Sequence, residues 1–227
     1  MKKLPLLGVA LALLALSGCA SDTTTFTDDD AQAIMFGQLT QAEFSSLGLT
    51  PASNTIATDS VKSYVTGVTD GDSVIDPKEC ANAVRLLILA DQDKNSADTF
   101  YALPTLTSGE TSISVKGRLF ATDGAAQKFV GDFEKANQGC PAFTDTQGNQ
   151  SIAIKVTVSE SADDSKGFRL DTVAGAPDGA TTFRTYIVRE GNLVIAIQGV
   201  TKTDDDANLL VATSAAIYAQ LTAGQAK

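Results

Sequence analysis

The three cysteines, Cys19, Cys80 and Cys140, are the side chains with the widest range of chemistry in this chain. A cysteine thiol can be acylated, can pair in a disulfide, or can act as a thiolate nucleophile or metal ligand. The chain contains no histidine. Ser-His-Asp and Cys-His catalysis are therefore excluded, as are zinc and haem held through imidazole. The sequence also has no glycine-rich loop of either common phosphate-binding pattern, and we assign no catalytic residue.

Cys19 closes a stretch with the three parts of a secretory signal. Two lysines at positions 2 and 3 precede an apolar run over residues 4–16, and residues 16–19 read Leu-Ser-Gly-Cys. The run has about 13 residues, whereas a membrane span needs roughly 20. Residues 16–19 resemble the lipobox of bacterial lipoproteins, whose cysteine receives a diacylglycerol while the signal is cut just before it. We expect residues 1–18 to be a lipoprotein signal peptide; the alternative is an ordinary secretory signal with an incidental cysteine.

Acylation would make Cys19 a membrane anchor on the extracytoplasmic face of the cell membrane. Two or three acyl chains on one residue anchor stably, whereas one chain binds only marginally. Loss of the signal removes two lysines, which leaves 15 basic against 27 acidic residues and a net charge of −12 instead of −10. So acidic a chain is repelled by phosphate backbones, and we expect no nucleic-acid partner. The polar, acidic residues that follow predict a lipidated flexible tether over 19–37.

Cys80 and Cys140 would meet an oxidising compartment after export, where a lone pair of cysteines usually joins. We predict a disulfide between them that closes a loop of about 60 residues. The chain-entropy model gives such a crosslink ~4 kcal/mol of stabilisation. The alternative is a pair of buried free thiols. With Cys19 acylated and the other two paired, no thiolate remains for catalysis or metal binding.

The acidic segment 91–102 is the best metal candidate in the sequence. Asp91, Asp93 and Asn95 have the first three spacings of a calcium-binding loop. However, the turn glycine of such a loop is replaced by serine, and Ala102 stands where a bidentate glutamate should close the cage. The alternative is a solvated acidic loop after a helix. We therefore predict no metal site.

Two other sets of charged side chains could take part in binding or chemistry. A hydrolase with paired carboxylates needs two acids facing each other across a cleft, but the acids of this chain fall mostly in predicted loops and helix starts. Four basic residues lie in or beside predicted strands and could meet an anionic ligand if they share a face. They are Lys155, Arg169, Arg184 and Arg189. Strand alternation puts Arg184 and Arg189 on opposite faces, and the alternative is a set of outward-facing cations.

Periodicity and turn signals predict helices and strands that alternate along one domain over 38–227. Helices are expected at 39–49, 76–92, 123–139 and 204–224, and strands at 111–121, 151–160 and 181–201, with weaker β-leaning pieces in 55–67. In the second helix Asp76 is the expected N-cap and Pro77 fits the first turn. The pair Gly191-Asn192 predicts a hairpin turn within 181–201. Hairpins with flanking helices predict an α+β fold with a mostly antiparallel sheet.

The order of these elements is similar to that of a known family. The segments QLTQAEFSSLGL, IDPKECANAV, GRLFATDGAAQKFVGDFEKANQGCPAF and YIVREGNLVIAIQGV, followed by a closing helix, resemble the PknH-like extracellular sensor domain. That family occurs in actinobacterial cell envelopes, on a receptor kinase and as free-standing lipoproteins. The resemblance covers roughly residues 38–222, and its most recognisable pieces are the Pro-x-x-Cys motif at 77–80 and the alanine-rich helix that runs into Cys140.

The resemblance implies a sheet with helices around a cleft that receives an unidentified ligand outside the membrane. Two features depart from the family. A tryptophan often precedes the second cysteine, whereas this chain has no tryptophan and carries Ala136 or Asn137 there. The kinase version also has a second disulfide, for which no cysteines are left. A PsbP-like lipoprotein fold, also α+β, is the nearest rival.

These observations lead to one expected function and two alternatives. We expect a lipid-anchored, extracytoplasmic sensor-like domain that binds a small ligand or an envelope protein, uses no cofactor and catalyses nothing. The first alternative is an envelope scaffold or assembly lipoprotein that acts through protein contacts. The second is a carboxylate-based hydrolase.

Overall fold

The computed structural model describes residues 25–34, 44–51, 57–60, 73–81, 83, 98–102, 105–160, 167–175 and 179–223. The helices in these residues are α1 (Asp28–Gln32), α2 (Phe44–Ser46), the 3-10 helix η3 (Lys78–Cys80), α5 (Asp123–Gln138) and α6 (Asp204–Ala223). The strands are β1 (Thr50–Pro51), β2 (Ala57–Ser60), β3 (Ser73–Asp76), β4 (Thr99–Ala102), β5 (Leu106–Ser108), β6 (Thr111–Leu119), β7 (Ala142–Gln147), β8 (Gln150–Glu160), β9 (Phe168–Ala174), β10 (Thr181–Glu190) and β11 (Leu193–Val200).

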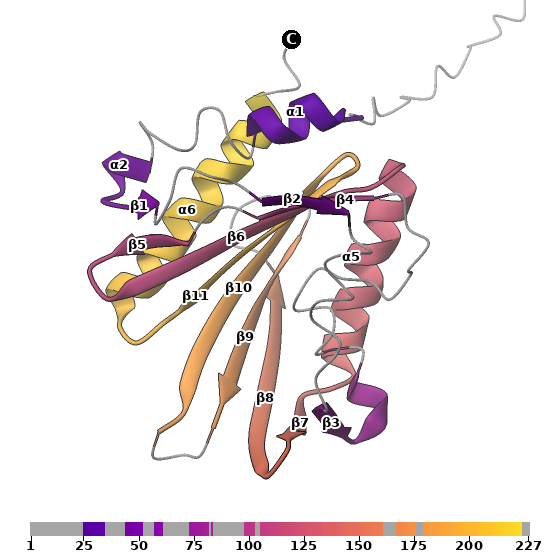
Figure 1. Cartoon of the computed structure of the whole chain (residues 1–227), viewed down its shortest axis with the longest axis vertical. Coiled ribbons are helices and arrows are strands. Elements are labelled where there is room, and N and C mark those ends of the chain that lie inside the picture. The colour runs from indigo at the N-terminus through magenta and orange to yellow at the C-terminus, as the bar shows by residue number, and fades with distance from the viewer. Residues whose placement is uncertain are drawn as a thin grey trace, which may run out of the picture.

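These strands form one antiparallel sheet with a helix on each face (Figure 1). The strand order is β1-β5-β6-β11-β10-β9-β8-β7-β3. β4 lies off this path and pairs with β2 and with the C-terminal part of β6. Strands β7 to β11 are consecutive in sequence, and each pairs with the next one. β11 pairs on its other edge with β6. The predicted α+β fold with a mostly antiparallel sheet in a single domain is confirmed.

The strongest local signals of the sequence give the elements that they predict. β6, β8, α5 and α6 lie at the predicted positions, within one to two residues at their ends. Gly191 and Asn192 connect β10 to β11 as a two-residue turn, and Gly191 has a φ of +50°, a conformation that glycine adopts without strain. The alternation of β8 also holds, because Ile154 and Val156 are buried while Lys155 is exposed.

The first apolar layer lies between α5 and the sheet. Phe129 and Phe133 on α5 stack with their ring centroids 6.3 Å apart, and Phe133 meets Phe168 of β9 at 5.5 Å. Gly167, next to β9, is required for this packing. A Cβ atom at Gly167 would lie 1.8 Å from the carbonyl oxygen of Ile187, so any side chain would push β9 away from β10. We call this face of the sheet the α5 side.

The second apolar layer lies between α6 and the opposite face, which we call the α6 side. Leu210, Ile217 and Leu221 of α6 are fully buried against it, as the predicted apolar stripe requires. Gly199 of β11 permits the close approach of the helix, because a Cβ atom there would come within 3.0 Å of the Leu210 side chain. Among the described residues, no helix is long and apolar enough to cross a membrane.

Two predicted helices differ from the structure in their described parts. Asp76 is not a helix cap but the last residue of β3, where it pairs with Thr144 of β7. That pairing keeps its backbone extended, and the 3-10 helix begins only after Pro77, which makes no side-chain capping bond. Helical backbone continues at residues 81 and 83, and residues 84–92 lie outside the described ranges. In the predicted helix 39–49, the described part is the short α2, which ends before Gly48, whose φ is +71°.

Part of the segment expected as a tether is folded onto the domain. Residues 25–34, which we call the N-terminal strap, lie within the expected tether 19–37. Phe26 is 5% exposed and Ala31 is fully buried, and both belong to the α6-side layer. α1 has a capping box, in which the Thr27 side chain accepts from the Asp30 amide and the Asp30 carboxylate accepts from the Thr27 amide. A tether described only as flexible is therefore wrong for residues 25–34.

Candidate functional site

The predicted disulfide between Cys80 and Cys140 is present. Their Cα atoms are 5.5 Å apart, and both residues are at least 96% buried. The bond joins η3 to the segment that follows α5, and so ties the edge strand β3 to the helix over the sheet. Cys80 and Cys140 are thereby structural. Cys19, the predicted lipidation site, lies outside the described residues.

The acidic segment 91–102 is described only in its last five residues. Asp91, Asp93 and Asn95 lie outside the described ranges, so the expectation that they form no metal site stays a prediction. Ala102 is the last residue of β4 and pairs with Lys116 of β6. Within the described part of the chain, no cluster of three or more histidine, cysteine, aspartate or glutamate side chains is arranged to hold a metal ion.

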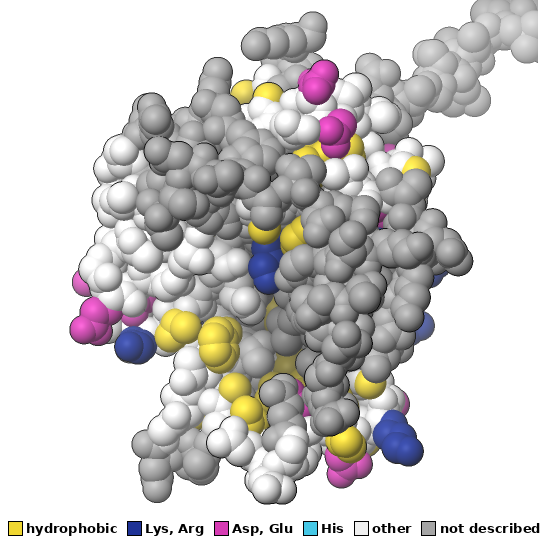
Figure 2. All heavy atoms as spheres, viewed as in Figure 1, with side chains coloured by type: hydrophobic (Ala, Val, Ile, Leu, Met, Phe, Trp, Pro, Cys, Tyr) yellow, Lys and Arg dark blue, Asp and Glu magenta, His cyan; other side chains and the backbone are white. Residues whose placement is uncertain are grey.

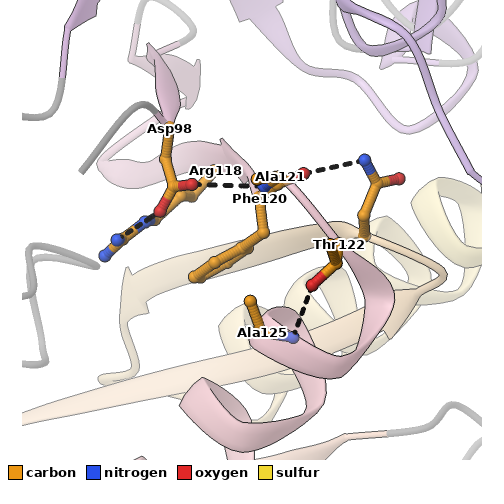
Figure 3. A network of polar contacts seen from close by, with 7 residues as sticks. Asp98, Arg118, Phe120, Ala121, Thr122 and Ala125 are labelled. Carbon is orange, nitrogen blue, oxygen red and sulfur yellow. Dashed lines mark hydrogen bonds and ion pairs between the residues drawn. The ribbon is translucent and has the colours of Figure 1, made fainter.

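A buried ion pair lies where β4, β6 and α5 meet (Figure 3). Arg118 is 2% exposed and donates through Nε to the carboxylate of Asp98 at 2.9 Å. The other carboxylate oxygen of Asp98 accepts from the Ala121 amide at 3.2 Å, and the guanidinium carbon of Arg118 lies 4.4 Å from the centre of the Phe120 ring. These contacts fix the end of β6 immediately before Thr122 caps α5. We assign Arg118 and Asp98 to positioning α5.

Three of the four strand cations share a face of the sheet, as an anion site would require. Arg184 and Arg169 both contact Asp171 on the α6 side, at 2.6 Å and 3.3 Å. The hydrogen bond to Asp171 raises the pKa of Arg184 above its usual value. Lys155 lies on the same side and is exposed. Because Asp171 already pairs with Arg184 across the β9–β10 strands and with Arg169 along β9, ion pairs within the sheet explain the two arginines.

Arg189 behaves as strand alternation predicts. It lies on the α5 side, opposite to Arg184, and forms an ion pair with Asp123 in the first turn of α5. Its guanidinium also donates to the carbonyl oxygen of Gly191 at 3.1 Å. Arg189 therefore secures the helix start to the β10–β11 turn, and it does not join the other cations.

The α5 side of the sheet is only partly covered by α5. The helix packs on β8, β10 and β11 near the β10–β11 turn, while the strand ends farther from that turn carry residues of intermediate exposure. Figure 2 looks onto this side and shows a depression with hydrophobic side chains at its floor and margin. We define the open α5-side surface by the described residues on this side beyond α5: Ser114, Phe183, Gln198 and Val200, which are partly exposed, together with Thr172 and Thr185, which are buried beside them.

The hydrogen bonding of this surface is incomplete. Gln198 donates from Nε2 to the Thr185 hydroxyl at 3.1 Å. Thr172, on the neighbouring strand β9, is 5% exposed, and its hydroxyl has no hydrogen-bond partner within the described part of the chain. It lies between Phe183 and Val156 in the strand register. Buried hydroxyls are nearly always paired, so an unpaired one beside a depression marks a position for a bound group.

Sequence reasoning did not find this surface. The relevant polar residues are a threonine on each of two strands and a glutamine on a third. Gln198 lies in one of the segments that carry the resemblance, but no functional motif includes any of the three. The available signal was the polar inward position Thr172, which continues the buried alternation of Phe168 and Leu170 in β9. Strand β9 itself was not predicted, and without it the face of Thr172 could not be assigned.

Comparison with known proteins gives no match in sequence but a match in fold. No protein-family model matches the chain, and no curated protein matches it either. The architecture is an antiparallel sheet with one long helix on each face, which is an α+β fold. Among solved structures, the chain is similar to the extracellular domain of PknH from Mycobacterium tuberculosis, with a TM-score of 0.51 and 10% sequence identity.

The PknH similarity extends over 86% of this chain and 92% of that domain. The chain is also similar to an uncharacterized protein from Mycobacterium smegmatis, with a TM-score of 0.45 and 12% identity over 75% of this chain and 89% of that one. The similarity to the PknH domain confirms the predicted resemblance to PknH-like domains for the fold.

Proposed function

We propose that this protein is a lipid-anchored, extracytoplasmic binding domain that holds a small ligand, or a segment of an envelope protein, on the open α5-side surface. The observation that carries the proposal is the buried Thr172 hydroxyl, which has no partner among the described residues beside the Gln198–Thr185 pair. Ligand sites are mostly apolar with a few placed polar groups, and here Phe183 and Val200 supply the apolar part. The occupant would combine an uncharged hydrogen-bonding group with an apolar body.

The proposed extracytoplasmic location of the protein is supported by the N-terminal sequence and by the fold. The Leu-Ser-Gly-Cys motif supports acylation of Cys19 after removal of residues 1–18. The fold is shared with a domain described as extracellular. The disulfide between Cys80 and Cys140 is in keeping with an oxidising compartment. In this proposal the domain binds and does not catalyse, and any signal would pass through a partner.

The two alternatives have less support among the described residues. A scaffold that works through protein contacts favours a contiguous exposed apolar patch. Val74 and Ile152 are exposed, but they lie on opposite faces of the sheet, and Val211 lies on α6. A hydrolase needs two facing carboxylates, yet the buried acids Asp145 and Glu190 also lie on opposite faces by strand alternation.

The decisive experiment is native mass spectrometry on the protein purified without denaturation from the envelope of its own host. We expect a discrete mass that is present under native conditions and lost on denaturation. The variant Thr172→Val removes the unpaired hydroxyl and keeps the side-chain shape, so it should retain at least several-fold less of this mass. Thr157→Val is the matched control, because Thr157 is exposed on the α6 side of β8. A clean apo mass, also after incubation with envelope extract, would instead favour a scaffold.

A further inference from the structure

The N-terminal strap is held on the domain by contacts that are independent of one another. Asn192 in the β10–β11 turn is 3% exposed; its side chain accepts from the Phe26 amide at 2.7 Å and donates to the Phe26 carbonyl at 3.0 Å. The hydroxyl of Tyr101, a fully buried residue on β4, donates to the Asp28 carboxylate. Burial of Ala31 in the α6-side layer fixes the next turn of the strap.

These contacts leave little free chain between the proposed anchor and the domain. From Cys19 to Phe26 the chain advances by seven residues, which reach at most about 25 Å when fully extended. A tether that was free to residue 37 would reach about 65 Å. β8 alone, with 11 residues, spans about 35 Å. The end of the domain at which Phe26 lies is therefore kept nearer to the lipid than the opposite end.

The structure also identifies which end that is. Figure 1 shows α1 at the same end of the sheet as the β10–β11 turn, with the β7–β8 turn at the opposite end. The start of α5 lies at the α1 end, because Asp123 pairs with Arg189 beside Gly191. Thr172 and Phe183 lie toward the other end, since Phe183 is seven residues before Glu190 and about 20 Å from it along β10.

We propose that the N-terminal strap orients the domain on the membrane, with the β10–β11 turn toward the bilayer surface and the open α5-side surface directed away from it. This proposal rests on the lipid anchor at Cys19 in the proposed function. Its consequence is that the occupant of the open α5-side surface arrives from the envelope space and not from the bilayer. Asp28, Asp29 and Asp30 on the membrane-facing end oppose adsorption to anionic headgroups, so the strap and not surface attraction sets the orientation.

Because the chain has no tryptophan, a single introduced tryptophan serves as a clean energy donor to dansyl-labelled lipid. The full chain is produced in a host that acylates lipoproteins and is reconstituted in phosphatidylcholine vesicles. Ala125→Trp places the donor in the first turn of α5, and Asn149→Trp places it in the β7–β8 turn; both positions are exposed. We expect transfer from the first donor to be at least several-fold more efficient than transfer from the second.

Two changes to the tether test the cause of the difference. Insertion of about twelve Gly/Ser residues between Ser21 and Asp22 leaves the domain intact and should lower transfer from Ala125→Trp toward the level of Asn149→Trp. Phe26→Ala, which removes the buried side chain that holds the strap in the α6-side layer, should lower it in the same direction. Equal transfer from both donors, with the lipid on Cys19 verified by mass spectrometry, overturns the orientation. Absence of the lipid mass overturns the anchor itself, so the two failures are distinguishable.

Discussion

Asn192 hydrogen bonds to both backbone groups of Phe26, a residue 166 positions earlier in the chain. The same amide also donates to the carbonyl oxygen of Phe120 at 2.8 Å. One side chain thus joins the β10–β11 turn, the end of β6 and the N-terminal strap. A two-residue hairpin turn usually needs its asparagine for backbone conformation, but here the side chain also secures the start of the folded chain.

Substitution of Asn192 by alanine should destabilise the fold through these lost bonds. Asn192→Ala leaves the Phe26 amide and two carbonyls without a partner in a buried site, and we expect a loss of roughly 3 kcal/mol in the free energy of unfolding. Urea denaturation measures it, and hydrogen exchange should show faster exchange at the Phe26 amide. Asn149→Ala in the exposed β7–β8 turn is the control, with little effect expected. Equal stability of the two variants would contradict the role of Asn192.

Loss of the disulfide should lower stability in a way that reduction reproduces. The double variant Cys80→Ser/Cys140→Ser opens a loop with a sequence separation of 60. The chain-entropy model puts the expected loss at up to about 4 kcal/mol. Thermal unfolding with and without a reductant measures it, and the reductant should shift the wild-type curve but not that of the variant. A reductant-insensitive wild type would show that the crosslink does not contribute.

The buried ion pair predicts a large effect for a small chemical change. Asp98→Asn keeps the shape of the side chain but removes the charge that pairs with Arg118, which is 2% exposed. Breaking such a buried pair is expected to destabilise by about 3–5 kcal/mol. Asp132→Asn is the matched control, because it breaks the Lys128–Asp132 pair, whose side chains are 75% and 60% exposed, and should change stability by less than about 0.5 kcal/mol. Denaturant titration of both variants tests the contrast.

The parts of the fold with a strong local pattern could be predicted from the sequence. The apolar alternation of β8, the stripe of α6 and the Gly191-Asn192 turn each carry their own signal within a few residues. The disulfide followed from the cysteine count and the expected compartment. For β8, α6 and the turn, the physical cause is burial of one face or a positive φ, and it acts within the same short stretch of sequence that carries the pattern.

The predictions that were wrong or missing concern features that depend on contacts between distant segments of the chain. Aspartate is a favoured helix N-cap residue, but the pairing of Asp76 with Thr144 makes it a strand residue. The strap is polar and acidic like a tether, yet Phe26 finds a buried partner in Asn192 far along the chain. The candidate site was missed for the same reason, because Thr172 and Gln198 come together only in the finished sheet.

Removal of the unpaired Thr172 hydroxyl should raise the stability of the unliganded protein and weaken ligand binding. Thr172→Val replaces a buried polar group that has no partner among the described residues by an apolar group of similar shape, so we expect the unliganded protein to be more stable by about 1 kcal/mol. The same change should weaken ligand retention. Thr185→Val removes the partner of Gln198 and should be destabilising instead. A less stable Thr172→Val variant would show that the hydroxyl is already satisfied within the protein.

Asp206 predicts a pH dependence at the start of α6. The Thr111 hydroxyl, together with the amides of Lys202 and Thr203, holds the pKa of Asp206 at about 2, below its ordinary value of 3.8. Because the folded-state pKa is depressed, this carboxylate stabilises the fold above about pH 4, and its contribution fades as the pH falls toward 2. Asp206 is partly exposed, so solvent screens its contacts, and we expect Asp206→Asn to cost at most about 1 kcal/mol at neutral pH.

Thermal unfolding across pH 2 to 7 measures this contribution, with Asp205→Asn as the control on the adjacent exposed carboxylate. The difference in stability between wild type and Asp206→Asn should be present at pH 7 and disappear near pH 2, because the wild-type carboxyl is then protonated as well. Asp205→Asn should follow the wild-type profile throughout, since its carboxylate accepts no comparable set of bonds. If both variants track each other, the link from Asp206 to β6 through Thr111 does not stabilise the helix start.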